Sequence, residues 1–170
     1  MEGYLESVPQ IGSFVRHIDR TKLEQIRYVR ESLETRVMVD GMKSGTFIPL
    51  IGKLQENLDR QRTQYDAKDY TGVHRLDDEF HDAFYIAADK MFVLEYMGVN
   101  HPDYARARFI SLVYDPQPFL LIQQHQRILD AVREQDEAAL RAAMREHLTN
   151  IYRVLPGCSA EIREYFDPAY

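Results

Sequence analysis

The sequence predicts an all-α fold, an antiparallel bundle of six to seven helices. From Thr21 to about Leu155 the apolar residues recur mostly at every third or fourth position, which is the spacing of one face of an α-helix. Glycine and proline are sparse in this stretch and fall where helices would break. In chain order, helices are expected at 21–40, 46–67, 70–89, 91–98, 103–114, 117–134 and 137–155, with a further candidate at 159–166.

The first nineteen residues differ from this pattern. The segment 6–15 combines proline and glycine with β-branched residues, which is typical of one strand of a small hairpin. The strand is expected near Ile11–Val15. We therefore divide the chain into a segment 1–19 and a helical domain 20–170.

The composition excludes several classes of protein. The 170 residues carry a net charge of −6, so the surface as a whole is not suited to binding a polyanion. Cys158 is the one cysteine, which excludes a disulfide framework and gives no support for a thiolate metal site. No apolar run approaches the ~18 residues that a membrane span needs, and no signal peptide is visible at the start. A soluble cytoplasmic protein with no membrane contact is expected.

Two histidines interrupt the apolar stripes of the last two long helices. Asp136 is well placed to cap the final helix, so a very short turn joins the two helices, which must run antiparallel and in contact. His125 lies 10 residues before Gln135 and His147 lies 12 residues after it. At a rise of about 1.5 Å per residue, both lie about 15–18 Å from the turn. The two imidazoles are therefore expected at the same level of the same interior.

The helix expected at 70–89 carries a similar anomaly. Asp77 and His81 lie within its apolar stripe, four residues apart and so on one face. A buried carboxylate is costly unless it is paired. One divalent metal ion would satisfy Asp77, His81, His125 and His147 together. Imidazole and carboxylate ligands suit Zn, which we expect first, and also Ni, Mn or Fe.

Other interpretations of these residues stay open. A single histidine on an apolar stripe is usually a hydrogen-bonded core residue, and Asp77 with His81 alone could be a pair on a helix surface. A ferritin-like dimetal bundle is disfavoured, because that fold uses Glu-x-x-His and no histidine here has a glutamate three residues before it.

Several stretches resemble the FCD domain, the effector-sensing half of many GntR-family transcription regulators. Residues 76–81 resemble its D-x-x-F-H signature, 124–132 its H-x-x-I-L-x-A-I helix, 136–148 its D-x-x-x-A-x-x-x-M-x-x-H-L stretch and 27–34 the R-x-x-L-E of its first helix. The resemblance covers about residues 20–155 and is to the metal-binding branch of the family. It implies an FCD-like helical bundle with Asp77, His81, His125 and His147 as the metal ligands.

The resemblance extends to the N-terminal segment and to partners. Residues 9–15 resemble the last wing strand, G-T-F-V, of the GntR winged-helix domain. This implies that 1–19 is the remnant of a wing and linker, and that DNA is bound only through a winged-helix domain that this chain lacks. A homodimer is expected, because the resemblance is to dimeric regulators and because some apolar residues exceed what one core needs. Those residues are Phe47, Ile48, Phe109 and Ile110.

The expected function follows from the resemblance and the metal site together. The chain would be the effector-binding and dimerisation domain of a GntR/FadR-type regulator, not an enzyme, and would sense a small carboxylate at the metal to modulate DNA binding. Arg30 is the first candidate for the side chain that meets this carboxylate, with Arg106 or Arg108 second.

Two alternatives to this function stay open. One is a stand-alone helical metalloenzyme, a hydrolase or isomerase that uses metal-activated water. It needs a general base near the metal, and the neighbouring Asp78, Glu79 and Asp82 point off the stripe. The other is a purely structural metal that mediates dimerisation, which a closed tetrahedral site would favour.

Overall fold

The computed structural model describes residues 4–99, 102–114, 117, 119–154 and 160–167. Its strands are β1 (Leu5–Val8) and β2 (Gly12–Val15), and its one 3-10 turn is η1 (Ile48–Leu50). Its helices are α1 (Arg20–Lys43), α2 (Ile51–Asp66), α3 (Tyr70–Ala87), α4 (Met91–Val99), α5 (Pro102–Tyr114), α6 (Leu120–Glu134), α7 (Glu137–Val154) and α8 (Ala160–Arg163). The predicted all-α fold is therefore confirmed. In the described ranges, no helix is both long and apolar enough to cross a membrane.

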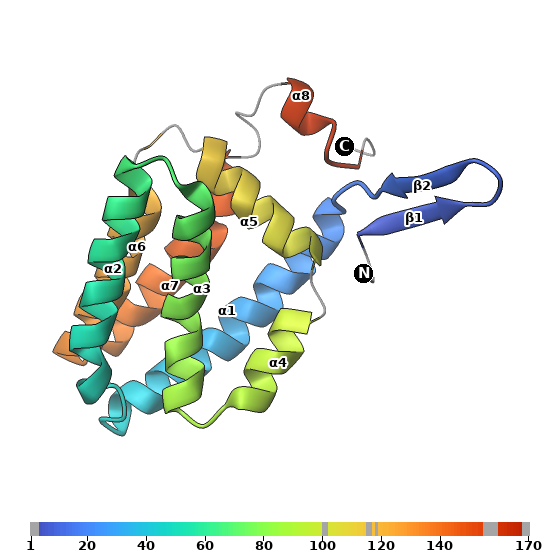
Figure 1. The fold of residues 1–170 in the computed structure, drawn as a ribbon. Coiled ribbons are helices and arrows are strands. Elements are labelled where there is room, and N and C mark those ends of the chain that lie inside the picture. The colour runs from blue at the N-terminus through green and yellow to red at the C-terminus, as the bar shows by residue number, and fades with distance from the viewer. Residues whose placement is uncertain (1–3, 100–101, 115–116, 118, 155–159, 168–170) are drawn as a thin grey trace.

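The centre of the bundle is enclosed by α1, α2, α3, α6 and α7 (Figure 1). Helix α1 packs against α3 and α7, α2 packs against α3 and α6, and α6 packs against α7. Helix α5 contacts α1, α3 and α7, and α4 packs on α3. Side chains that point inward from α3, α6 and α7 therefore meet in one interior.

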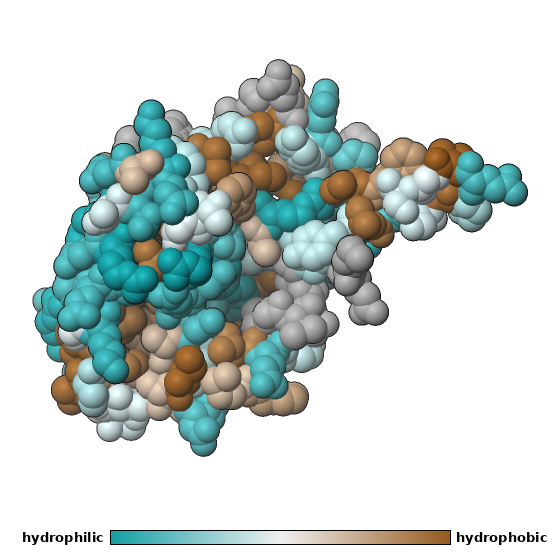
Figure 2. All heavy atoms as spheres, viewed as in Figure 1, coloured by the Kyte–Doolittle hydropathy of each residue, from teal (hydrophilic) through white to brown (hydrophobic). Residues whose placement is uncertain are grey.

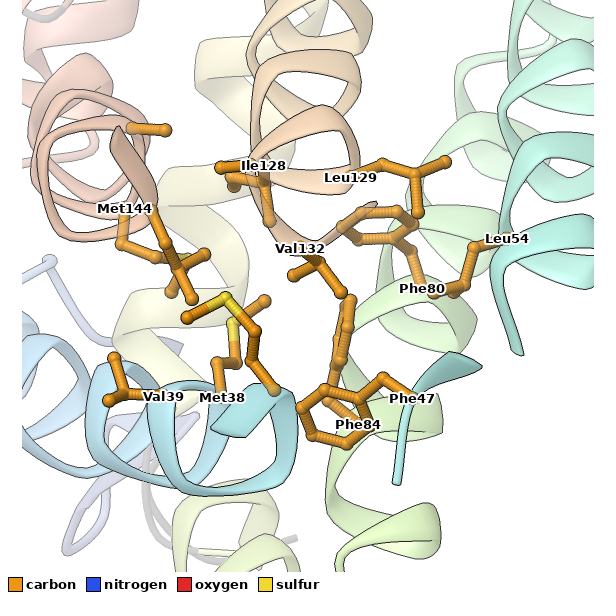
Figure 3. Close-up of a cluster of buried hydrophobic side chains, with 14 of the residues drawn as sticks. Met38, Val39, Phe47, Leu54, Phe80, Phe84, Ile128, Leu129, Val132 and Met144 are labelled. Atoms are coloured by element: carbon orange, nitrogen blue, oxygen red, sulfur yellow. The ribbon is translucent and has the colours of Figure 1, made fainter. Parts of the chain in front are cut away.

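The larger hydrophobic core lies at the end of the bundle where α1 runs into α2 (Figure 3). Three phenylalanines organise it. The rings of Phe47 and Phe84 meet edge to face with centroids 5.0 Å apart, and those of Phe80 and Phe84 do so at 5.5 Å. A second core lies around the start of α1. Its buried members are Ile18, Leu23, Ile26, Tyr104, Ala107, Ile151, Ile162 and Phe166.

Aspartates cap the N-termini of three helices, α1, α3 and α7. The carboxylate of Asp19 accepts a hydrogen bond from the backbone N–H of residue 22 at 3.0 Å, and Asp69 does the same for residue 72 at 2.9 Å. Asp136 accepts from the backbone N–H of Ala139 at 2.9 Å, as predicted. Between α6 and α7 the chain reverses at Gln135, whose φ of 56° is left-handed. The short antiparallel connection of α6 and α7 is thus present.

Two predicted helices begin later than expected. The helix expected from residue 46 starts as α2 at Ile51, because the chain turns at Gly45 with a φ of 73° and then forms η1. The helix expected from residue 117 starts as α6 at Leu120, because Phe119 has a left-handed φ of 62° that no α-helix can contain. Residues 155 and 159, expected at helix ends, lie outside the described residues.

The predicted strand is present and has a partner. Strands β1 and β2 pair antiparallel, with Leu5 opposite Val15, and the hairpin projects from the bundle (Figure 1). Its apolar side chains are exposed, and they appear as brown spheres on the projection in Figure 2. The segment between hairpin and α1 is held by the C-terminal part of the chain, because the backbone of Ile18 pairs with that of Phe166 in a parallel bridge.

Gly41 provides a test of this packing. A Cβ atom on Gly41 would overlap the ring of Phe47, which is buried and packed edge to face on Phe84. Gly41→Ala should therefore lower the free energy of unfolding by about 1–3 kcal/mol, measured by urea denaturation.

The control is Gly52→Ala on α2. No atom outside the neighbouring backbone lies within 4 Å of a Cβ at this position. Because alanine favours helix over glycine, this variant should be neutral or stabilised by up to about 1 kcal/mol. Equal stability of the two variants would contradict the packing described for Phe47.

Candidate metal centre

The four predicted metal ligands come together in the interior of the bundle. Asp77 and His81 lie one turn apart on α3, His125 lies on α6 and His147 on α7. All four side chains are buried, and one ligand atom from each lies within 4.8 Å of the others. The turn at Gln135 does bring His125 and His147 level, since their ring centroids are 4.7 Å apart.

The ring nitrogens that face one another are all Nε2. His81 Nε2 lies 3.0 Å from His147 Nε2, and His125 Nε2 lies 3.0 Å from Asp77 Oδ1. His81 Nε2 is 3.8 Å from the same carboxylate oxygen. The ring of Phe80 stacks on that of His125 with centroids 4.5 Å apart, which fixes the plane of this imidazole.

Arg108 on α5 orients the carboxylate of Asp77. Its guanidinium donates to Asp77 Oδ2, and also to Asp78 Oδ1 at 2.7 Å. The two oxygens of Asp77 thus have different surroundings: Oδ2 faces the arginine and Oδ1 faces the histidines.

Arg30 and Glu34 form a buried ion pair next to His81. Arg30 donates from Nε and Nη2 to Glu34 Oε1, at 3.0 and 2.6 Å. The guanidinium lies over the ring of Tyr104, 4.9 Å from its centroid. The second oxygen of Glu34 lies 3.8 Å from His81 Nδ1, on the side of the ring away from the cluster. Glu34 therefore compensates the charge of Arg30, and its second oxygen faces His81 from the side away from the cluster.

The charge states of the cluster follow from burial and from Arg108. For Asp77, burial favours the neutral acid, but the charge of Arg108 and the neighbouring histidines outweigh it and hold the pKa well below its usual value. For His81 and His147, burial dominates and lowers the pKa well below the usual value. Around neutral pH the cluster therefore holds an ionised carboxylate and at least two neutral imidazoles.

The residues present fit a divalent metal ion. Asp77 Oδ1 and His125 Nε2 are buried and 3.0 Å apart, yet neither has a hydrogen-bond partner within the described part of the chain. A carboxylate and neutral imidazoles are the donors that Zn, Ni, Mn and Fe accept. A cation between these atoms would satisfy both of them.

The three predicted arginines differ in position. Arg30 and Arg108 reach the cluster, as described above. Arg106 does not: its guanidinium donates to the backbone carbonyl of Arg16 at 2.7 Å and lies 3.7 Å from Asp103. The structure thus places Arg106 at the segment that precedes α1. Among the described residues, Arg106 does not line either of the two cavities that border the cluster.

Two cavities flank Arg30 and Arg108. The smaller, of about 50 Å³, is reached by Asp77 and His147 as well as by both arginines. The rest of its wall is largely apolar and includes Leu112, Leu148 and Ile151. The larger, of about 370 Å³, lies on the side of His81 and Glu34. The ligand cluster is therefore buried, and on each of two sides of it lies a cavity that Arg30 and Arg108 line.

Glu34 belongs to this site but does not stand out in the sequence as a site residue. Its spacing of four residues from Arg30 was a usable signal, because opposite charges at this spacing pair on one helix face. The pattern did not show that the pair would be buried, since apolar and polar residues are not cleanly separated into two faces around α1.

The all-α bundle, with a buried polar cluster beside a cavity, has the architecture of a helical ligand-binding domain. Residues 25–150 match the FCD domain family, and the chain belongs to that family. The predicted resemblance to the FCD domain is thereby confirmed.

Several transcriptional regulators are similar to the chain over nearly its whole length. An uncharacterized HTH-type transcriptional regulator in an unstable DNA locus of Streptomyces ambofaciens is 30% identical over 166 residues, which are 97% of this chain and 69% of that protein. The HTH-type transcriptional repressor RspR of Escherichia coli K12 is 26% identical over 164 residues, which are 96% of this chain and 72% of that protein. The chain is thus an FCD effector-binding domain of a GntR-family transcriptional regulator, a regulatory class and not an enzyme class, as predicted.

A solved structure has the same fold. E. coli McbR/YncC superposes with a TM-score of 0.72 over 92% of this chain and 79% of that chain, at 18% sequence identity. At this identity the likeness concerns the fold alone.

Proposed function

We propose that the domain senses a small carboxylate at a divalent metal ion held by Asp77, His81, His125 and His147, and that binding modulates the affinity of the regulator for DNA. The observation that carries the proposal is the convergence of these four buried ligand atoms within 4.8 Å, two of them without a hydrogen-bond partner in the described residues. The metal would supply positive charge and open coordination positions, with zinc as the first expectation and Ni, Mn or Fe as alternatives.

The side chains around the metal ligands give the site its preference for an anion. One carboxylate and neutral imidazoles leave a divalent ion with a net positive charge. Arg30 and Arg108 add guanidinium donors nearby, although Glu34 and Asp78 compensate their charges. Both arginines already contact carboxylates, so an incoming anion would share their donors with Glu34, Asp77 and Asp78. Arg30 is the stronger candidate, because Arg108 also orients a metal ligand.

The smaller cavity limits what the effector can be. A volume of about 50 Å³ suits a ligand of few heavy atoms, and the apolar wall favours a short alkyl chain over further charged groups. We therefore propose a short monocarboxylate, and we use propionate as the probe and citrate as the comparison.

Metal binding is the first prediction. After chelation and dialysis, calorimetric titration with Zn²⁺ should give one ion per chain, and His147→Ala should bind it far more weakly. Because the ion binds only the folded state, a free concentration 100 times the Kd should stabilise the wild type by about 2.7 kcal/mol in thermal unfolding.

His17→Ala is the matched control, because His17 is exposed and lies outside the cluster. This variant should bind Zn²⁺ as the wild type does. The proposal fails if the wild type binds none of the four metals, or if His147→Ala keeps the stoichiometry and affinity of the wild type.

Effector binding is the second prediction. Replacement of Arg30 alone would leave Glu34 buried without its partner, so the test variant is Arg30→Gln with Glu34→Gln. A charge-assisted hydrogen bond is worth about 1.5–3 kcal/mol, so the Zn²⁺-loaded double variant should bind propionate about 10–100-fold more weakly. Calorimetry with propionate measures this.

The matched control for this pair is Arg36→Gln with Asp40→Asn. It removes an ion pair with the same spacing on the same helix, but an exposed one. This control should bind propionate like the wild type, and citrate should bind more weakly than propionate. Equal affinity for propionate in wild type and the Arg30/Glu34 variant would refute the role of Arg30.

We propose that the β1–β2 hairpin belongs to the wing of a winged-helix domain and that the bundle itself does not contact DNA. The exposed apolar side chains of the hairpin support this, because such residues normally pack against something. The curated relatives named above are longer than this chain, which spans 69% and 72% of their lengths.

We also propose that the chain forms a homodimer, through a surface that differs from the one first expected. Phe47 was wrong as a dimer residue: it is buried in the larger core, where it fills the space left by Gly41. Ile110 is half-buried against the second core, while Ile48 and Phe109 are exposed.

The better candidate surface is formed by the end of α3 and by α4. It consists of Ile86, Met91, Phe92 and Tyr96, all exposed, with Phe92 exposed to 78%. Brown and pale brown spheres gather at the lower edge of the molecule in Figure 2, where Figure 1 places these helices. A surface of this kind is typical of a protein interface.

Light scattering tests this surface. The wild type should have the mass of a dimer, and Phe92→Asp should shift it toward the monomer, because a charge at the centre of an apolar interface is costly to bury. Ile48→Asp is the control, since Ile48 is an exposed apolar residue in η1, outside this surface. A monomeric wild type, or a dimeric Phe92→Asp variant, would contradict the proposal.

A further inference from the structure

Behind His125 lies a buried chain of amides on α2. Asn57 and Gln61 are one turn apart on this helix, and both are buried. Asn57 Nδ2 donates to the backbone carbonyl of Leu76 at 3.1 Å, and Gln61 Nε2 donates to Asn57 Oδ1 at 2.7 Å. Gln61 Oε1 then lies 3.1 Å from His125 Nδ1.

The direction of this chain is determined by its first member. A backbone carbonyl can only accept hydrogen bonds, so the NH2 group of Asn57 must face Leu76 and its oxygen must face Gln61. The NH2 group of Gln61 therefore points to Asn57 and to the same carbonyl, which lies 3.4 Å from it. This leaves only the oxygen of Gln61 toward His125, and that oxygen can only accept.

Because Gln61 offers an acceptor, Nδ1 of His125 must carry a proton. In a neutral imidazole the other nitrogen, Nε2, then has a free lone pair. This lone pair faces Asp77 Oδ1, an acceptor 3.0 Å away. Two acceptors at this distance repel each other unless a cation lies between them.

We propose that Gln61 is a positioning residue that sets the tautomer of His125, so that its Nε2 is available to a metal ion. The inference rests on the metal site proposed above and adds a residue outside the ligand set. The ring of Phe80, which stacks on that of His125, restricts rotation of this imidazole and so keeps its Nδ1 toward Gln61.

The partner of His125 differs from those of the other ligands. Asp77 is held by an arginine, and His81 faces a glutamate at 3.8 Å. Gln61 is fully buried, so a charged group in its place would be costly, whereas a neutral amide orients the ring without adding charge. Replacement of a residue that orients a metal ligand in this way commonly weakens metal binding roughly 10–100-fold.

The test compares Gln61→Leu with Gln61→Glu. Gln61→Leu removes the acceptor at similar size, and should weaken Zn²⁺ binding about 10–100-fold in competition with a chelator. In Gln61→Glu, burial favours the neutral acid, whose O–H can donate to Asn57 while its carbonyl oxygen still accepts from Nδ1. This variant should therefore retain most of the affinity, which a merely space-filling role would not explain. In the metal-free protein, long-range ¹H–¹⁵N NMR should show the proton of His125 on Nδ1 in the wild type, and a shift toward Nε2 in Gln61→Leu.

Gln55→Leu is the matched control. Gln55 also lies on α2 and exchanges amide hydrogen bonds with Gln126 of α6, at 3.1 Å in each direction, but it touches none of the four ligands. This variant should bind Zn²⁺ like the wild type. The role of Gln61 is overturned if Gln61→Leu and Gln55→Leu have the same affinity, or if His125 of the metal-free wild type carries its proton on Nε2.

These outcomes separate the inference from the function on which it rests. A wild type that binds no metal ion would refute the proposed function. The NMR measurement on the metal-free chain would still decide whether Gln61 sets the tautomer.

Discussion

The buried carboxylate of Asp77 is the group on which the arrangement around the site depends. An ionised carboxylate in the interior is tolerated only if its oxygens are compensated. Arg108 of α5 compensates Oδ2, and the histidines of α3, α6 and α7 surround Oδ1. One side chain thus connects groups on four helices, α3, α5, α6 and α7. Removal of Arg108 would leave the charge of Asp77 against neutral imidazoles.

The same requirement explains why α2 matters, although it contributes no ligand. The helix packs against α3 and α6, and its buried polar residues face the carbonyl of Leu76 and the ring of His125. Buried amides are costly without partners, and here each amide satisfies the next. The resulting chain joins the backbone of α3 to a side chain of α6, so the position of His125 relative to Asp77 is determined on two sides.

The parts of the site that local rules govern could be predicted from the sequence. Asp77 and His81 share a face because they are four residues apart, and His125 and His147 are level because the turn at Gln135 is short. The same rules gave most of the helix limits. They failed at Phe119, where a left-handed residue delays α6, because such a backbone angle leaves no periodic signal.

What could not be predicted depends on contacts between helices far apart in the sequence. Gln61 lies 64 residues from His125, and its role follows only from the packing of α2 on α6. Phe47 is a large aromatic residue of the kind that is common in protein interfaces. It fits inside the bundle only because Gly41, which it packs against, has no side chain. Helical periodicity shows which face of a helix is apolar, but not which neighbour that face meets.

Arg106 shows how such a contact changes the meaning of a residue. It lies two positions from Arg108 on α5, and the two side chains point to different parts of the molecule: Arg108 to Asp77, and Arg106 to the carbonyl of Arg16 before α1. Helix α5 therefore contacts both the ligand cluster and the segment that leads to the hairpin. Coupling between two sites requires an element whose position both of them affect. A change in the contact between Arg108 and Asp77 would bear directly on a helix that also contacts the segment before α1.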